Sequence, residues 1–282
     1  AFQNLAINRP FEPGSTFKPF IASALIGDGH VSLTDSIFCE NGSWKLGRRV
    51  IRDVHPYGRL SFEDVIAKSS NVGMAKLVQK VDDKRLYRAL RSFGFGNYTG
   101  SEFSGEDKGR LYQPSRWDRT TKTSLSIGYG LLVTPLQMAM AYAALANGGT
   151  LYEPAVVNRI TDENGNVHHE FQPRRVRRAA GADVIANVSC AMVKVVEDGT
   201  GAAARVAGFP VAGKTGTSMK ANPGSGYNGN GYIGSFGGFF PADDPQVAIY
   251  VVINEPSFSH RWGGSSAAPV FGEIIRNTMI SS

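Results

Sequence analysis

The stretch EPGSTFKP at residues 12–19 holds a serine and a lysine three positions apart, Ser15 and Lys18. Residues three apart share one face of a helix, so this spacing brings the hydroxyl and the amine within hydrogen-bonding distance. A lysine whose pKa is lowered by burial or by a second cation can take the serine proton. Pro13 and Gly14 predict a turn before the helix, where free backbone N–H groups can face a developing oxyanion. Because about one Ser-x-x-Lys is expected by chance in a chain of this length, the pair alone does not establish a nucleophile.

Two further groups strengthen that hypothesis. Ser69-Ser70-Asn71 lies between two helical patterns, and Lys214-Thr215-Gly216-Thr217 follows a strand-like run. A Lys-Thr-Gly arises by chance in about one chain in fifteen of this length. Ser-x-x-Lys, Ser-x-Asn and Lys-Thr-Gly, in this order, are the motifs of penicillin-binding proteins and serine β-lactamases.

The chain resembles the transpeptidase domain of a class B penicillin-binding protein, of the division type that makes septal peptidoglycan. The resemblance covers nearly the whole chain and extends well past the three motifs. The matching segments are FEPGST at 11–16, KSSNVG at 68–73, GYGLLVTPLQ at 128–137, ANGG at 146–149 and AGKTGTS at 212–218.

The resemblance implies an α+β fold of the penicillin-binding and serine β-lactamase type. Such a fold has an antiparallel sheet flanked by helices and an all-helical subdomain. In that family several tens of residues, including sheet strands, precede the nucleophile, whereas fourteen residues precede Ser15. We therefore expect residues 1–282 to be one transpeptidase domain, a fragment of a longer membrane-anchored protein without its N-terminal sheet strands. The family works at the periplasmic, extracytoplasmic face of the bacterial inner membrane.

The residues suit acyl transfer. Ser15 would attack a carbonyl carbon while Lys18 accepts the serine proton, and Ser69 would pass that proton to the leaving group with help from Lys214. Two lysines that converge on one cleft would lower each other's pKa, which makes a neutral base reasonable at pH 7. Asn71 would hold both Lys18 and a substrate amide by hydrogen bonds.

The Lys-Thr-Gly-Thr segment suits a substrate carboxylate. Lys214 would supply charge, and Thr215 and Thr217 would supply hydroxyl donors. Gly216 would let the ligand approach the strand closely. The resemblance places the oxyanion hole at the backbone N–H groups of Ser15 and Thr217.

Some features of the sequence have a structural explanation as well as a functional one. Ser69 and Asn71 are also typical of helix starts, and capping can coexist with catalysis. Tyr227 and Tyr232 are candidates for lining the pocket, although core packing explains them equally well. The glycine-rich segment at 222–231 is interpreted as a flexible rim between two strands.

The composition excludes several other classes. The net charge is +6, but the densest basic run, residues 174–178, lacks the interleaved aromatic residues of a nucleic-acid surface. It is interpreted as a solvated loop, with attraction to an anionic envelope surface as a weaker alternative. The five histidines are scattered, and neither metal-ligand spacing nor a phosphate-binding glycine loop is present, so no cofactor or metal is expected. Cys39 and Cys190 are interpreted as unpaired, partly buried thiols.

The remaining pattern predicts the elements around these motifs. Helices are expected from Ser15 to about residue 25, and at 61–68, 72 onward, 82–93, 134–147, 182–197 and 268–279. Residues 94–124 are interpreted as a long surface excursion. A β-hairpin is expected around the Asn164-Gly165 turn, and three antiparallel strands at 206–213, 232–240 and 246–254.

Hydrophobic spacing also predicts which helical side chains face the core. The expected core residues are Leu136, Ala139, Met140, Ala143 and Ala144; Val184, Val188, Met192, Val195 and Val196; and Val270, Phe271, Ile274 and Ile275.

By resemblance, the first functional hypothesis is a serine D,D-transpeptidase that cross-links peptidoglycan stem peptides and is acylated by β-lactams. A glycosyltransferase and other division proteins would be its partners, and the membrane would be reached only through an N-terminal anchor. One alternative is a β-lactamase whose nucleophile motif also reads Ser-Thr-Phe-Lys. Asn71 and the absence of an evident deacylating glutamate argue against it. A second alternative is a non-enzymatic β-lactam sensor domain.

Overall fold

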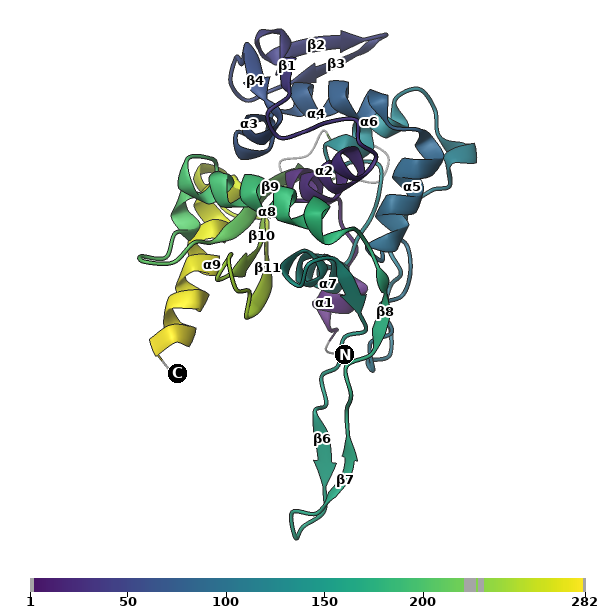
Figure 1. Ribbon diagram of the computed structural model, residues 1–282, viewed down its shortest axis with the longest axis vertical. Coiled ribbons are helices and arrows are strands. Elements are labelled where there is room, and N and C mark those ends of the chain that lie inside the picture. The colour runs from purple at the N-terminus through teal and green to yellow at the C-terminus, as the bar shows by residue number, and fades with distance from the viewer. Residues whose placement is uncertain (1–2, 221–226, 228–230, 281–282) are drawn as a thin grey trace.

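A three-stranded antiparallel sheet forms the centre of the fold (Figure 1). The computed structural model describes residues 3–220, 227 and 231–280 of the 282-residue chain. The strand order is β11-β10-β9, and the strands are β9 (Ala212–Met219), β10 (Tyr232–Phe240) and β11 (Val247–Asn254). Two of the three strands lie where the sequence predicts them. The prediction of a strand at 206–213 is wrong, because β9 begins at Ala212 and itself contains the Lys-Thr-Gly motif.

Helices cover both faces of this sheet, as expected for an α+β fold. Helix α9 (Gly263–Ile280) packs on one face, whereas α7 (Pro135–Ala146) and α8 (Ala182–Glu197) pack from the other side (Figure 1). Side chains alternate between the faces along β10: Phe236 joins the cluster around α9, and Phe239 joins the cluster around α7. This period of two places Lys214 on the face of α7 and Thr215 on the face of α9.

An aromatic cluster holds the nucleophile helix in place. A 3-10 turn, Gly14–Phe17, leads into helix α2 (Lys18–Gly27), as the sequence predicts. Phe17 and Phe20 are fully buried, and their rings lie 4.8 and 4.9 Å from the ring of Phe95. The ring of Tyr142 from α7 meets Phe20 edge-on at 5.4 Å. Edge-to-face packing of this kind adds about 0.5–1.5 kcal/mol per pair beyond area burial.

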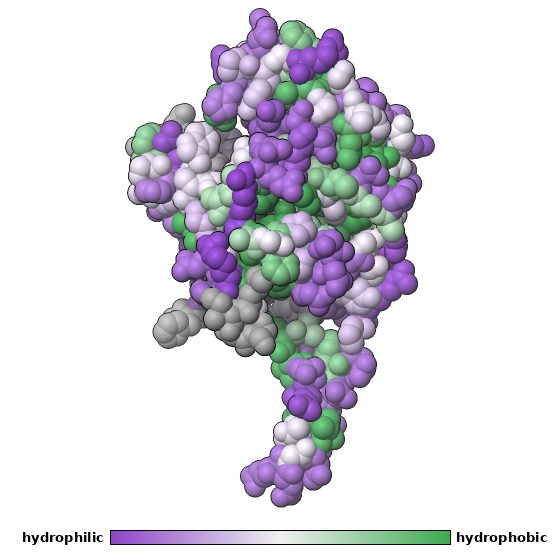
Figure 2. Space-filling model, turned by 60° about the vertical axis from the view of Figure 1, so that its left-hand side comes forward, coloured by the Kyte–Doolittle hydropathy of each residue, from purple (hydrophilic) through white to green (hydrophobic). Residues whose placement is uncertain are grey.

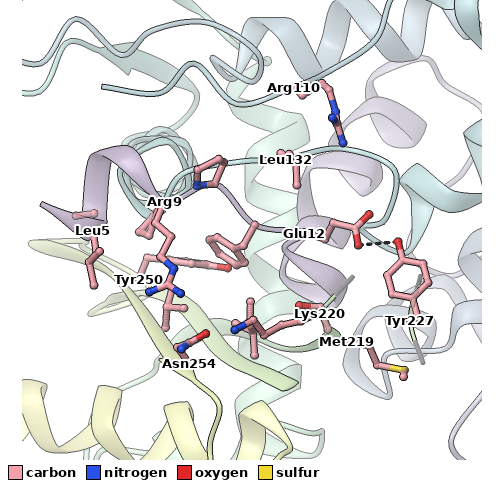
Figure 3. Close-up of a pocket in the computed structure, with 17 residues that line it drawn as sticks. Leu5, Arg9, Glu12, Arg110, Leu132, Met219, Lys220, Tyr227, Tyr250 and Asn254 are labelled. Atoms are coloured by element: carbon pink, nitrogen blue, oxygen red, sulfur yellow. Dashed lines mark hydrogen bonds between the residues drawn. The ribbon is translucent and has the colours of Figure 1, made fainter. Parts of the chain in front are cut away.

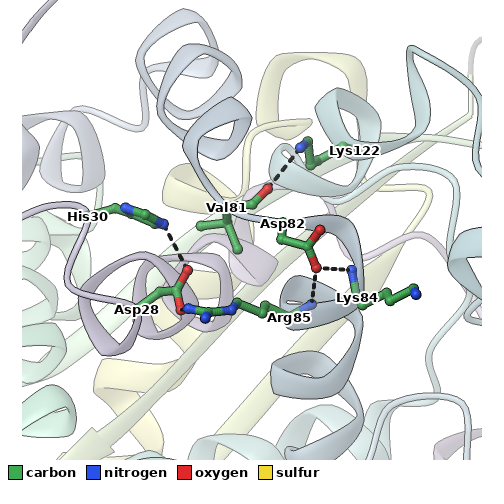
Figure 4. A network of polar contacts seen from close by, with 7 residues as sticks. All are labelled: Asp28, His30, Val81, Asp82, Lys84, Arg85 and Lys122. Carbon is green, nitrogen blue, oxygen red and sulfur yellow. Dashed lines mark hydrogen bonds and ion pairs between the residues drawn. The ribbon is translucent and has the colours of Figure 1, made fainter.

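Capping residues define most of the predicted helix starts. The remaining helices are α1 (Leu5–Asn8), α3 (Phe62–Ala67), α4 (Asn71–Leu77), α5 (Asp83–Ser92) and α6 (Thr121–Ser126). Ser61 caps α3, and Asp82 caps α5 (Figure 4). Thr134 and Gln137 form a reciprocal capping box at the start of α7. Each such cap satisfies backbone N–H groups that the helix itself leaves without partners.

Four two-stranded sheets surround this body. Strands β1 (Ser36–Phe38) and β4 (Arg59–Ser61) pair, as do β2 (Ser43–Leu46) and β3 (Arg49–Arg52). On the other side of the molecule, β5 (Thr150–Tyr152) pairs with β8 (Arg175–Arg178).

The predicted hairpin is the fourth pair. Strands β6 (Arg159–Thr161) and β7 (Val167–Glu170) form it, and every residue of both strands is exposed. It projects from the body in both views (Figures 1 and 2). The basic run at 174–178 was predicted to be a solvated loop. It is exposed as expected, but most of it forms strand β8 rather than a loop.

The core-facing predictions succeed for α8 and fail in part elsewhere. All five residues expected inward on α8 are buried. On α7 only Ala144 of the predicted set is buried, and the inward face is formed by Met138, Ala141, Tyr142 and Leu145 instead. On α9, Phe271 and Ile275 are buried, whereas Val270 and Ile274 are exposed at 36% and 40%.

Both cysteines are free, as the sequence suggests, but they differ in exposure. Cys39 is fully buried and Cys190 is exposed, so the expectation of two partly buried thiols is wrong in that detail. Within the described residues, no helix is long and apolar enough to cross a membrane.

Candidate active site

The turn that presents Ser15 is fixed by a neighbouring glycine-rich segment. Gly14 N–H donates to the carbonyl oxygen of Gly128 at 3.1 Å, and Phe11 exchanges backbone hydrogen bonds with Val133. Gly128 has φ of +79°, and a Cβ there would lie 1.9 Å from the Gly14 oxygen. Only glycine allows both this conformation and this contact. The glycine-rich segment around Gly128 therefore fixes the position of the turn that carries Ser15.

Two tyrosine hydroxyls form hydrogen bonds with Thr16 in the turn that carries Ser15. The hydroxyl of Tyr142 donates to the carbonyl oxygen of Thr16 at 2.8 Å. Thr16 Oγ1 donates to the Pro13 carbonyl at 2.8 Å and lies 2.7 Å from the hydroxyl of Tyr250 on β11. Thr16 is fully buried, so these bonds are shielded from water. They tie the nucleophile turn to the sheet and to α7.

The Ser-x-Asn motif forms the tight link between α3 and α4, as predicted. Ser69 has φ of +60°, a left-handed conformation that is uncommon for a residue with a side chain. This conformation turns its carbonyl towards Lys18, whose Nζ donates to Ser69 O at 2.6 Å. Lys18 Nζ also lies 3.1 Å from Ser69 Oγ and 2.8 Å from Asn71 Oδ1.

These contacts leave neutral Lys18 with a lone pair directed to a hydroxyl. The Ser69 carbonyl and Asn71 Oδ1 can only accept, and Asn71 Nδ2 donates to the carbonyl of Arg52 at 3.0 Å, which fixes the amide orientation. Two N–H groups of a neutral amine satisfy these two acceptors. The remaining lone pair can then accept from a hydroxyl, of Ser69 or of an approaching Ser15. Within the described residues, Ser15 Oγ itself makes no hydrogen bond.

Burial makes the neutral form of Lys18 accessible. Lys18 is fully buried, and this desolvation lowers its pKa to about 7, opposed by the negative charge of Asp53. Lys214 is also fully buried, which lowers its pKa well below its usual value, and the charge of Lys18 lowers it further. Burial is therefore the main cause of both pKa shifts. The predicted mutual effect appears in one direction only, because the charge of Lys18 lowers the pKa of Lys214 whereas the shift of Lys18 comes from burial opposed by Asp53.

The strand with the Lys-Thr-Gly motif forms one wall. A Cβ on Gly216 would lie 2.8 Å from Thr16 Cγ2 and 2.9 Å from the Pro13 oxygen, so the nucleophile turn packs directly on β9. Thr217 Oγ1 accepts from the N–H of Gly263 at 2.9 Å, which leaves its own proton available for a ligand. Thr215 Oγ1 lies 2.6 Å from the hydroxyl of Thr200.

These segments meet in one cavity of about 410 Å³. Ser15, Ser69, Asn71, Thr215, Gly216 and Thr217 all line it, and the two lysines are buried beneath these residues. Sequence reasoning missed four parts of the wall. These are Val54, His55 and Tyr57 before β4; Lys68; Thr200; and the start of α9 around Trp262. Except for Lys68, which adjoins the Ser-x-Asn motif, nothing in their local sequence marks them, because they reach the cavity only through the tertiary fold.

The structure does not bring the two tyrosine candidates to this cavity. Tyr227 lines a separate, larger cavity of about 560 Å³ on the face of the sheet next to α1, where its hydroxyl donates to Glu12 Oε2 at 2.7 Å (Figure 3). Tyr232 packs its ring against Phe258. Most of the glycine-rich segment at 222–231 lies outside the described residues. The described part of the chain contains no group of three or more residues suited to a metal ion.

Comparison with known proteins identifies the family. The model of the penicillin binding protein transpeptidase domain matches residues 1–276, and the chain belongs to this family. It is 32% identical to Stage V sporulation protein D of Bacillus subtilis and 33% identical to the peptidoglycan D,D-transpeptidase FtsI of Escherichia coli. Each alignment covers 98% of the chain but only 43% and 45% of the relative, so the chain spans less than half of either protein.

Solved structures confirm the fold. Penicillin binding protein 3 of Mycobacterium tuberculosis in complex with aztreonam matches with a TM-score of 0.90 and 34% identity, over 100% of this chain and 65% of that one. The transpeptidase domain of penicillin-binding protein 3 from Burkholderia pseudomallei matches with a TM-score of 0.89 and 31% identity, over 99% of this chain and 82% of that one. The predicted fold class and family are therefore correct.

Proposed function

We propose that this chain is the catalytic domain of a serine D,D-transpeptidase, in which Ser15 carries the acyl group. The observation that supports this most is the hydrogen-bonded arrangement of Lys18, Ser69 and Asn71 beneath the cavity that Ser15 lines. The relatives named D,D-transpeptidases and the aztreonam-bound neighbour support the same chemistry.

In the first step, Ser15 Oγ attacks the carbonyl carbon of the penultimate D-alanine of a stem peptide. Lys18, with its pKa near 7, accepts the serine proton. Negative charge develops on the carbonyl oxygen, and the backbone N–H groups of Ser15 and Thr217 stabilise it. The packing of the nucleophile turn on β9 supports this pairing of donors.

The tetrahedral intermediate then expels the terminal D-alanine. Its nitrogen needs a proton, and Ser69 Oγ–H supplies it while taking the proton held by Lys18 across their 3.1 Å contact. The acyl group stays on Ser15 as an ester. In the second step, an amine of a neighbouring stem peptide attacks this ester, loses its proton to Lys18, and Ser15 recovers its hydroxyl proton.

Substrate orientation comes from β9. The free proton of the Thr217 hydroxyl and the hydroxyl of Thr215 donate to the terminal carboxylate. Lys214 lies buried below them, where a bound carboxylate would favour its charged form. Gly216 removes the side chain that would otherwise hold the substrate away from the strand.

A transfer assay tests the proposal. The chain is given a D-alanyl thioester donor and a free D-amino acid, and the transfer product is measured, with Ser15→Ala as the matched control. We expect Ser15-dependent transfer and a stable β-lactam adduct. Catalytic turnover of nitrocefin would show a β-lactamase instead, and a stable adduct without any transfer would indicate a sensor domain.

The wider setting follows from the family and is also part of the proposal. Residues 1–282 form one transpeptidase domain of a longer, membrane-anchored protein of the division type. It works at the extracytoplasmic face of a bacterial inner membrane on peptidoglycan stem peptides, is inhibited by β-lactams, and acts beside a glycosyltransferase and other division proteins.

A further inference from the structure

A carboxylate outside the three motifs holds the Ser-x-Asn link. Asp53 follows strand β3, and its Oδ1 accepts from the backbone N–H groups of Asn71 and, at 3.0 Å, Val72. Its Oδ2 accepts from the hydroxyl of Ser70 at 2.7 Å. Both carboxylate oxygens are therefore used to fix the first residues of α4.

Helix capping alone does not account for this arrangement. Ser70 already caps α4, because its Oγ accepts from the N–H of Gly73 at 2.9 Å. Asp53 accepts from the first two backbone N–H groups of the helix and from the Ser70 hydroxyl. The carbonyl of the preceding residue, Arg52, accepts from the side-chain amide of Asn71. The segment at 52–53 thus determines which atom of Asn71 faces Lys18.

We propose that Asp53 is a positioning residue for Lys18: its carboxylate fixes the Ser69–Asn71 link that holds the Lys18 amine, and its negative charge acts on the same amine. This inference rests on the proposed acylation of Ser15. Helix α4 is short, and three of its first four N–H groups find side-chain acceptors only through Asp53 and Ser70.

The charges around Lys18 define the direction of the effect. Burial lowers the pKa of Lys18, and the negative charge of Asp53, in the loop after β3, opposes this by favouring the charged amine. The second buried lysine, Lys214 on β9, has its own pKa lowered well below its usual value by burial and by the charge of Lys18. Burial raises the pKa of Tyr57 and of the Cys39 thiol, and the charge of Asp53 adds to both increases. Removal of the Asp53 charge should therefore lower the pKa of Lys18 further.

The test is the pH profile of acylation by a fluorescent penicillin between pH 5 and 9. In the Asp53→Asn variant we expect the midpoint of the acidic limb to fall by about one pH unit. We also expect the plateau rate to fall by about 10- to 100-fold because the amine is held less well. A loss of helix capping alone would lower stability without moving the midpoint.

Asp82→Asn is the matched control. Asp82 caps α5 in the same way, accepting from the N–H groups of Lys84 at 2.9 Å and Arg85 at 3.1 Å (Figure 4). None of the described residues lining the Ser15 cavity belongs to α5. This variant should lose a comparable cap and keep the wild-type midpoint.

Two outcomes would overturn the inference. One is a folded Asp53→Asn protein whose midpoint coincides with that of the wild type while acylation still depends on Ser15. The other is that neither Asp53→Asn nor Asp53→Ser folds, although the serine keeps an oxygen that can cap the helix. Asp53 would then be needed for folding rather than for positioning Lys18. Acylation that persists in Ser15→Ala would instead refute the proposed function itself.

Discussion

Substitution of Gly128 by alanine tests how the nucleophile turn is positioned. The new Cβ would lie 1.9 Å from the Gly14 oxygen, 2.4 Å from its carbonyl carbon and 2.7 Å from its Cα. Real Cβ atoms essentially never approach other atoms within 3.0 Å, so the turn must move by about 1.1 Å. A displacement of that size in a catalytic group costs about 100-fold in rate.

Gly130→Ala provides a closely matched control. Gly130 has the same φ of +79°, so alanine there meets the same left-handed strain of about 1 kcal/mol. Its Cβ, however, would meet only Ser124 Cβ at 3.6 Å, an ordinary contact. The difference between the two variants therefore isolates the displacement of the turn from the backbone strain.

The assay is the second-order rate constant for acylation by a fluorescent penicillin, measured beside thermal unfolding. We expect Gly130→Ala to acylate within a few-fold of the wild type and Gly128→Ala to be about 100-fold slower. Equal acylation rates for the two variants would show that contact with Gly128 does not position Ser15, and the argument for the turn would fail.

Three further predictions concern single groups. Lys18 has a pKa of about 7 and must be neutral to accept the serine proton, so acylation should be about 100-fold slower at pH 5 than on the plateau of the pH profile. Stopped-flow fluorescence measures this rate, and a flat pH profile would exclude Lys18 as the base. Tyr142→Phe should lose about 1–3 kcal/mol in denaturant unfolding, because the buried Thr16 carbonyl loses its donor; an unchanged free energy of unfolding would refute that anchor. A thiol reagent should modify Cys190 in the native protein and Cys39 only after unfolding, since Cys39 is buried and burial raises the pKa of its thiol.

The burial of Lys18 should also change how the free energy of unfolding depends on pH. The folded-state pKa of Lys18 is lowered from 10.5 to about 7, so between these values the unfolded chain binds more protons than the folded one. Stability should therefore rise as pH increases from about 7 towards 10.5 relative to Lys18→Met, because that variant lacks this titration. Parallel stability curves for the two proteins, from urea unfolding, would contradict the burial of an uncharged amine.

Local signals in the sequence were sufficient to predict where most helices begin. Ser61, Asp82 and Thr134 mark helix starts by a mechanism confined to a few neighbouring residues, and the structure confirms all three. Helix α8 has a polar and an apolar side, so its inward face was also predictable. Helix α7 is apolar on most sides, and its periodicity therefore could not determine which stripe faces the core.

Non-local features were beyond sequence reasoning. Strand β9 is rich in glycine and small residues rather than β-branched ones, so its local pattern did not place it at 212–219. Asp53 contacts residues 17 to 19 positions away through a loop with no motif, and only the fold reveals it. The motifs were predictable because their chemistry is recognisable; the groups that hold them were not.

The site of the β-lactam adduct tests the central claim most directly. The protein is incubated with penicillin, digested, and the modified peptide is identified by mass spectrometry. We expect a single adduct on Ser15 in the wild type and none in Ser15→Ala. An adduct on any other residue of the wild-type protein would contradict the assignment of Ser15 as the nucleophile.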